Sequence, residues 1–171
     1  MDYRRQYVIS FGGLKPGKHQ FDFEIDNRFF EEFEYSEYKT GSLQVIVEME
    51  KQQRMLILDF SVSGSIEVVC DRCLDIFPLE IAGNYQLFVK FGSESHEESD
   101  DVIVIPENET RFDVGHYIYE YIILSVPIRH VHPDNDDGSS GCDPEVLKEL
   151  EKLKAVEKAD PRWDALKKLK E

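Results

Sequence analysis

Three cysteines are the residues of this chain whose type and spacing are best suited to chemistry. Cys70 and Cys73 are separated by two residues, and Cys142 lies far downstream, behind His130 and His132. Thiolate sulfur and imidazole nitrogen are the usual ligands of structural zinc, and a Cys-x-x-Cys pair supplies two ligands from one turn. A fold that brings these two regions together would therefore assemble a Cys3His metal site.

The same cysteines have two other interpretations. A Cys-x-x-Cys pair also serves thiol exchange, but it then normally lies between a strand and a helix, whereas strand-like segments flank this pair on both sides. The three cysteines could instead be reduced, partly buried residues next to a hydrogen-bonded histidine. A thiol oxidoreductase is thus the weaker functional alternative, and a metal-free cluster is the simplest structural one.

No catalytic motif accompanies the cysteines. The sequence contains no glycine-rich loop that opens a helix after a strand, no Gly-x-Ser-x-Gly and no His-Glu-x-x-His. These motifs place phosphates, nucleophiles and catalytic zinc in the common enzyme classes, so their absence from the sequence argues against those classes. We expect a protein that is not an enzyme, with no small-molecule substrate evident.

The elements that must position the cysteine pair are predicted to be strands. Alternation of apolar and polar residues, with glycine, proline and polar punctuation between the segments, is typical of antiparallel strands. The pair would then lie on a turn between two of them. Strands are predicted at residues 3–10, 19–25, 42–50, 54–62, 65–69, 77–81, 84–91 and 102–105.

Two segments have helical spacing instead. Residues 112–125 predict a core helix with Asp113 as its cap and Pro127 after its end. A second helix should start at Asp143, because proline and carboxylates suit the first turn of a helix; its apolar stripe would dock on the body or on a partner. A short helix over 28–33, capped by Asn27, and a solvated loop over 92–101 complete the prediction.

These elements predict an α+β fold whose body is an antiparallel sheet or a partly open barrel, with C-terminal helices. The domain organisation follows the same pattern. Residues 1–133 would form the β-rich body with one core helix, residues 134–142 a mobile acidic loop, and residues 143–171 a C-terminal helical extension.

The charge distribution limits the partners of such a body. The formal net charge is −15, and residues 143–171 contribute nothing to it because they contain eight basic and eight acidic residues. An acidic body repels polyanions, so direct RNA binding would have to be local, and a basic protein is the more natural partner. No apolar run reaches the length of about 20 residues that a membrane span needs, and no export signal is recognised, so we expect a cytoplasmic protein.

Several motifs together resemble the bacterial YceD family of ribosomal-RNA accumulation proteins. They are Cys70-Asp-Arg-Cys73-Leu74 between strands, Ile123-Leu-Ser-Val-Pro127 at the end of a helix, His132 followed by Cys142, and the terminal Asp160-Pro-Arg-Trp-Asp-Ala-Leu-Lys-Lys-Leu-Lys170. The similarity is firmest from Cys70 onward. The longer acidic insert between His132 and Cys142, and the aromatic character of residues 112–125, depart from the family pattern.

The resemblance implies a role without catalysis in making or retaining large-subunit ribosomal RNA during ribosome biogenesis. The residues that match the family pattern are Cys70, Cys73, His132 and Cys142. From their types we expect these four to hold zinc, with His130 as the reserve ligand. The terminal segment would contact either large-subunit ribosomal RNA, through a cation and a stacking ring beside lysines, or a ribosomal protein or assembly factor, through an amphipathic helix. The residues concerned are Arg162, Trp163, Leu166, Lys167, Lys168 and Leu169.

Overall fold

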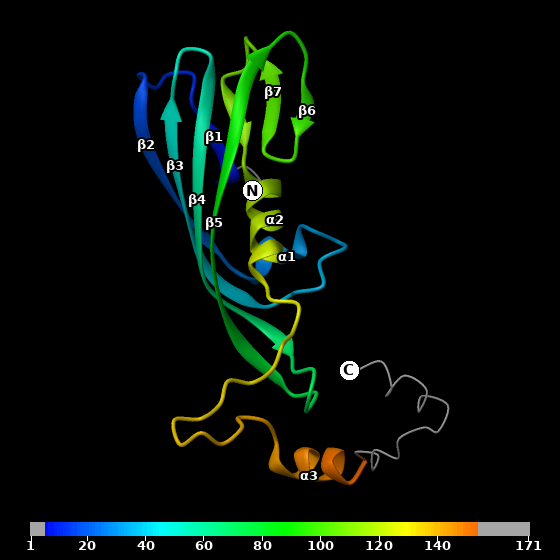
Figure 1. Ribbon diagram of the computed structural model, residues 1–171. Helices are drawn as coiled ribbons and strands as arrows, with labels where there is room; N and C mark the ends of the chain where they lie inside the picture. The colour runs from blue at the N-terminus through cyan, green and yellow to red at the C-terminus, as the bar shows by residue number, and fades with distance from the viewer. Residues whose placement is uncertain (1–5, 154–171) are drawn as a thin grey trace, which may run out of the picture. The chain divides into compact units, whose positions relative to one another are not determined.

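The computed structural model describes residues 6–153, which form two compact units (Figure 1). Within the described range, the first unit contains residues 6–69 and 76–130 and is called the β unit below. The second contains residues 70–75 and 131–153 and is called the cysteine unit. The short turn over 70–75 interrupts the β unit in sequence, so the chain passes through the cysteine unit twice.

A six-stranded open sheet is the framework of the β unit, with the strand order β2-β3-β4-β5-β7-β6 (Figure 1). Neighbouring strands are antiparallel except for β5 and β7, which are parallel. This arrangement confirms the predicted α+β class and shows that the body is a sheet and not a closed barrel. The strands are β2 (Gly17–Ile25), β3 (Gly41–Lys51), β4 (Met55–Val69), β5 (Ile76–Gly92), β6 (His96–Ser99) and β7 (Val102–Pro106).

The remaining elements are one small sheet and three helices. Strands β1 (Val8–Ser10) and β8 (Arg111–Asp113) pair antiparallel with each other. The helices are α1 (Asn27–Glu31), α2 (Gly115–Ser125) and α3 (Pro144–Leu153). Helix α2 packs on strands β4 and β5 and confirms the predicted core helix (Figure 1). None of the described helices combines the length and apolarity that crossing a membrane requires.

One face of the central strands supplies the core, as the sequence alternation predicts. Every second residue of β3 from Leu43 to Met49, and of β4 from Leu56 to Val62, is buried. Ile118 and Ile122 of α2 are fully buried as well. Tyr121 of the same helix stacks on Tyr85 of β5 at a ring-centroid distance of 4.5 Å. The helix thus buries its apolar side in the β unit.

The strands are longer than the sequence pattern indicates. The segments predicted as separate strands at 54–62 and 65–69 form one strand, β4, which continues through Gly64. Gly64 adopts φ +139°, a backbone conformation in which a residue with a side chain would be strained. It pairs with Leu43 of β3. The segments 77–81 and 84–91 likewise form the single strand β5. A glycine in a sequence predicts the end of a strand, but here it lies inside a strand, where the backbones approach each other closely.

Three further predictions on local structure are wrong. The polar run 92–101 is not only a loop, because His96–Ser99 forms edge strand β6 paired with β7. The cap of α1 is Asp26, whose carboxylate accepts from the N–H of Arg28. Asn27 instead accepts from the N–H of Gly41. Asp113 ends β8, although its carboxylate accepts a hydrogen bond from the N–H of Gly115 at the start of α2.

Candidate metal centre

The turn that joins β4 to β5 brings the sulfur atoms of Cys70 and Cys73 into one cluster. The N–H of Cys70 donates to the carbonyl of Asp75, and the N–H of Leu74 donates back to the carbonyl of Cys70, both at 2.9 Å. Leu74 takes a left-handed backbone conformation with φ 67° to complete this tight turn. The N–H of Arg72 points at the sulfur of Cys70 at 3.4 Å. Backbone N–H groups that face a cysteine sulfur stabilise its thiolate.

The loop over residues 131–142 closes on itself and brings its two ends together. Asp134 and Ser140 form an isolated antiparallel bridge. A Cβ on Gly141 would overlap the carbonyl oxygen of Pro133, so only glycine allows this approach. His132 and Cys142 are therefore brought close across the base of the loop.

The two parts of the cysteine unit are also held together by hydrogen bonds between side chains. Arg72 donates from Nη1 to the hydroxyl of Ser140 at 3.1 Å, and this hydroxyl accepts from the N–H of Cys142 at 3.3 Å. Ser140 thus links the turn over 70–75 to the residue that carries the third thiol. Arg72, Ser140 and Gly141 were not identified from the sequence, because their roles depend on contacts between segments far apart in the chain.

The four predicted ligands form one compact cluster. One donor atom from each of Cys70, Cys73, His132 and Cys142 lies within 4.8 Å of all the others. Cys70 Sγ is 3.7 Å from Cys142 Sγ, and Cys73 Sγ is 3.4 Å from Nδ1 of His132. The three cysteines are buried, and His132 is partly buried. The arrangement joins two ligands from the turn with two from the loop.

Two of these separations fit the edges of a tetrahedral zinc site. With Zn–S of about 2.3 Å and Zn–N of about 2.0–2.1 Å, tetrahedral geometry requires S···S of about 3.8 Å and S···N of about 3.6 Å. The two measured edges, 3.7 Å and 3.4 Å, are close to these values. A disulfide would need sulfur atoms about 2.05 Å apart, and all three cysteines are free thiols. The donor set and its spacing therefore suit a tetrahedral cation.

The electrostatics of the cluster favour a positive ion at its centre. Burial opposes ionisation of the Cys70 thiol, but the backbone N–H groups of Cys73, Arg72 and His132 lower its pKa to about 5. Burial raises the pKa of the Cys73 thiol, and the neighbouring sulfurs of Cys70 and Cys142 raise it further. Several thiolates at this spacing repel one another unless a cation neutralises them, and zinc binding removes their protons.

The structure distinguishes between the two histidines that precede Cys142. His132 belongs to the cysteine unit and to the cluster, whereas the reserve ligand His130 belongs to the β unit. The ring of His130 lies edge-on to Tyr38, with centroids 6.3 Å apart. The predicted binding residues of the terminal segment, from Arg162 to Leu169, lie outside the described residues.

The fold and the cluster define an α+β protein with a candidate structural metal centre of the Cys3His type. The chain belongs to the YceD family, because the family model described as "Large ribosomal RNA subunit accumulation protein YceD" matches residues 58–170. The match spans all four cluster residues and confirms the resemblance seen in the sequence. Neither a curated protein nor a solved structure shows significant similarity to the chain.

Proposed function

We propose that this protein is a factor without catalytic activity that supports the accumulation or processing of large-subunit ribosomal RNA. The observation that carries the proposal is the family match over residues 58–170, whose description names accumulation of the large ribosomal RNA subunit. The acidic composition, with a net charge of −15, favours action through a basic protein or a local RNA contact over bulk attraction to RNA.

In this proposal Cys70, Cys73, His132 and Cys142 hold a structural zinc ion. The ion would join the turn over 70–75 to the loop over 131–142 and so stabilise the start of α3, which begins two residues after Cys142. A full set of four protein ligands leaves no position open for water or substrate, which is the pattern of structural and not catalytic zinc. The ion's chemistry here would be limited to binding and neutralising the thiolates.

The burial of the cluster supports this role over thiol exchange. A redox-active cysteine must be reached by its substrate, and reactive thiols are typically accessible. Cys70 is 0% exposed, Cys142 3% and Cys73 6%. A buried Cys-x-x-Cys pair whose sulfurs face a third thiol and an imidazole is better suited to holding a metal.

The sequence of the terminal segment suits two kinds of partner, an RNA and a protein. Arg162 and Trp163 with Lys167 and Lys168 could contact single-stranded RNA, and Trp163 with Leu166 and Leu169 could instead occupy a groove of a ribosomal protein or assembly factor. Binding to RNA should weaken steeply with salt and be lost when Arg162, Lys167 and Lys168 are neutralised. Binding to a protein should survive nuclease treatment.

The RNA role is tested in cells that lack this protein. We expect a lowered ratio of large-subunit to small-subunit ribosomal RNA, measured by quantitative electrophoresis and gradient sedimentation, and restoration by the wild-type chain. An unchanged ratio would contradict the proposed role.

The metal site is tested separately by elemental analysis of protein purified without a polyhistidine tag. The wild-type chain should contain one equivalent of zinc, and Cys142→Ser should lose most of it. His130→Gln is the matched control, because this neighbouring histidine lies outside the cluster, and it should keep the full equivalent. The absence of metal from the wild-type chain, or equal content in Cys142→Ser, would remove the zinc site from the proposal.

A further inference from the structure

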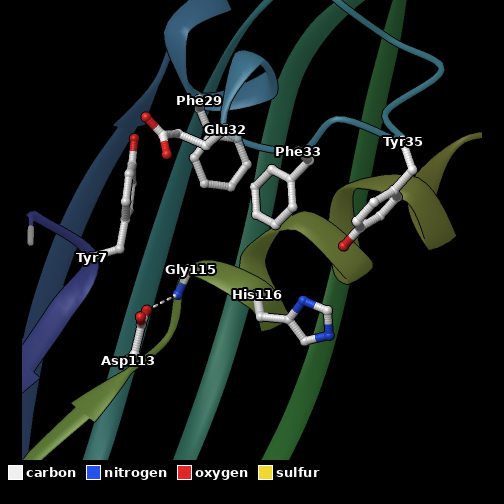
Figure 2. Close-up of a pocket in the computed structure, with 8 residues that line it drawn as sticks. All are labelled: Tyr7, Phe29, Glu32, Phe33, Tyr35, Asp113, Gly115 and His116. Atoms are coloured by element: carbon white, nitrogen blue, oxygen red, sulfur yellow. Dashed lines mark hydrogen bonds between the residues drawn. The ribbon is translucent and has the colours of Figure 1, made fainter. Parts of the chain in front are cut away.

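A pocket of about 270 Å³ lies in the β unit, where α1 and the segment after it meet the start of α2 (Figure 2). Four segments of the chain form its walls: the residue before β1, helix α1 with the turn after it, the end of β8, and the start of α2. All the described residues that line it belong to the β unit. The aromatic residues that line it are Tyr7, Phe29, Phe33 and Tyr35, and the polar ones are Glu32, Asp113 and His116.

The aromatic rings of the pocket form a continuous series. Tyr7 meets Phe29 edge-on at a centroid distance of 4.9 Å, and Phe29 meets Phe33 at 5.3 Å. Phe33 also meets Tyr35 at 6.0 Å. Phe29 is fully buried and anchors the series, whereas Tyr35 is 69% exposed at its outer end. Because the ring of Tyr35 is exposed and lies next to other rings, its face is available to a ligand and does not pack in the core.

The charged groups around these rings are mainly acidic. Glu32 and Asp113 line the pocket, and Glu31, Glu34 and Glu37 lie exposed in the same aromatic segment of sequence. Among the described residues that line the pocket, His116 is the only one that can become cationic, and its Nε2 lies 3.0 Å from a carboxylate oxygen of Glu120. The pocket therefore combines π-faces with negative charge.

A second pocket of the same character adjoins the first through Tyr35, which lines both. Its volume is about 580 Å³. Tyr117 and Tyr119 from α2 contribute rings, while Glu97, Asp100 and Asp101 contribute carboxylates from the edge of the sheet. The ring of Tyr119 stacks on Phe33 at 4.1 Å, so the aromatic series continues from one pocket to the other. The volumes of the two pockets together leave room for more than one side chain of a ligand.

We propose that these two pockets bind an arginine-bearing segment of a basic protein. A cation over an aromatic face is attracted by the ring quadrupole, and the flat guanidinium group both stacks on rings and donates to carboxylates in pairs. The net charge of −15 adds long-range attraction for such a segment and repulsion of RNA. The inference deepens the proposed function by naming the chemistry of a partner, and it assigns the contact to the β unit instead of the terminal segment.

The test uses the full chain and a fluorescein-labelled peptide with several arginines, with binding followed by fluorescence anisotropy. The same peptide with citrulline in place of arginine keeps the shape and removes the charge. We expect saturable binding of the arginine peptide, weaker binding of a lysine counterpart, and no binding of the citrulline peptide. Equal binding of the arginine and citrulline peptides would overturn the proposal.

Two variants assign the binding to the pockets. Tyr35→Leu keeps an apolar side chain but removes the π-face, and it should weaken the affinity about two- to fivefold, the range of an exposed cation–π contact. Asp113→Asn keeps the acceptor for the Gly115 N–H but removes the charge, and it should weaken binding and reduce its salt dependence. Circular dichroism would show that both variants remain folded. Unchanged affinity in both would overturn the proposal.

The control variant is Glu48→Gln, which removes one negative charge from an exposed position on β3 that lines neither pocket. It should leave the affinity unchanged, and a loss equal to that of Asp113→Asn would show a bulk charge effect and overturn the assignment. A single-stranded RNA oligonucleotide that binds more tightly than the peptide, and is displaced by it, would also overturn the choice of a protein partner. The cellular ratio of ribosomal RNAs tests the proposed function independently. If the peptide does not bind but the ratio still falls in cells that lack the protein, the pocket proposal fails and the proposed function stands.

Discussion

The two units of this protein bury different kinds of residue. The β unit has a continuous core of strand and helix side chains, including Phe29, Leu58, Phe60, Ile118 and Ile122, all 1% exposed or less. In the cysteine unit, the only buried residues among those described are Cys70, Cys73 and Cys142. Helix α3 has no buried residue over Pro144–Leu153.

This contrast indicates two sources of stability. The hydrophobic effect scales with the apolar area that is removed from water, and the β unit removes a large one. The cysteine unit has too small an apolar interior to order its loop by burial, and small units of this kind usually depend on a metal or on disulfides. We therefore expect the proposed zinc ion to fold the cysteine unit and the β unit to fold without it.

The largest expected effect follows from removing the proposed zinc ion. Structural zinc contributes an apparent binding free energy of about 10–16 kcal/mol in small peptides, and in such systems that energy is folding energy. A chelator should therefore abolish protection from hydrogen exchange at the N–H groups of Leu74, Asn135 and Leu147, which are hydrogen-bonded in the cysteine unit. Exchange in strands β3 and β4 should not change. Mass spectrometry of peptides would measure both.

Equal loss of protection in both units would contradict the contrast, because it would mean that the β unit also depends on the metal. Retained protection at Leu147 in fully metal-free protein would contradict it in the opposite direction. Restoring zinc to the chelated sample is the control, and it should return the exchange pattern to its starting state.

The second effect is expected in the β unit alone. Leu58 is 0% exposed in the middle of β4, so Leu58→Ala should lower the free energy of unfolding of this unit by about 2–5 kcal/mol through lost burial and a residual cavity. Denaturant titration followed by the signal of the sheet would measure it. Zinc content should stay at the wild-type value, and a parallel loss of zinc would show that the two units fold as one.

A smaller effect is expected at Gly64, which allows β4 to continue without a break. Alanine here would be strained at φ +139°, and its Cβ would overlap the carbonyl oxygen of Ser42. Gly64→Ala should therefore lower the free energy of unfolding by about 1–3 kcal/mol. Gly13→Ala is the matched control, since its Cβ would meet no atom within 4 Å. Equal thermal stability of the two variants would contradict the assigned role of Gly64.

The smallest effect concerns an ion pair on the surface of the β unit. A hydrogen bond from Lys90 and its positive charge hold the pKa of the Glu98 carboxyl below its usual value of 4.5. A lowered folded-state pKa stabilises the folded protein above the unfolded value, and that stability is lost as the pH falls below 4.5. Wild-type protein should exceed Glu98→Gln slightly in melting temperature at neutral pH and match it in acid.

High salt provides the control for this pair. Both side chains are about half exposed, so the interaction is screened by solvent and should disappear from the difference between wild type and Glu98→Gln at high ionic strength. A difference that persists in acid or in concentrated salt would contradict the ionic origin of the effect.

Much of the fold could be predicted from local patterns. Alternation of apolar and polar residues located strand β3 and the first part of β4, and helical spacing located α2, because strands and helices have periods that a sequence displays directly. The number of strands was harder to predict. Gly64 and Gly83 divided β4 and β5 into pieces, since a glycine that ends a strand and one that lies inside it look the same in a sequence.

The candidate site could be predicted in its chemistry but not in its full geometry. The Cys-x-x-Cys spacing, the third cysteine and a histidine before it indicated a metal-binding donor set. The hydrogen bond between Arg72 and Ser140 joins segments 68 residues apart. The approach of Gly141 to Pro133 closes a loop that has no regular period. The aromatic and acidic pockets around Tyr35 could not be predicted from the sequence either, because their rings come from separate elements.

The sequence by itself determined which ligands, rings and charges this protein possesses and in which local elements most of them lie, because side-chain chemistry and short-range periodicity are properties of neighbours along the chain. Only the tertiary structure decided that the two cysteines of the turn meet His132 and Cys142, and that Tyr7 reaches the rings beside α2. These choices depend on the path of the backbone between distant segments, and that path is set by the packing of the whole sheet and the closure of one loop.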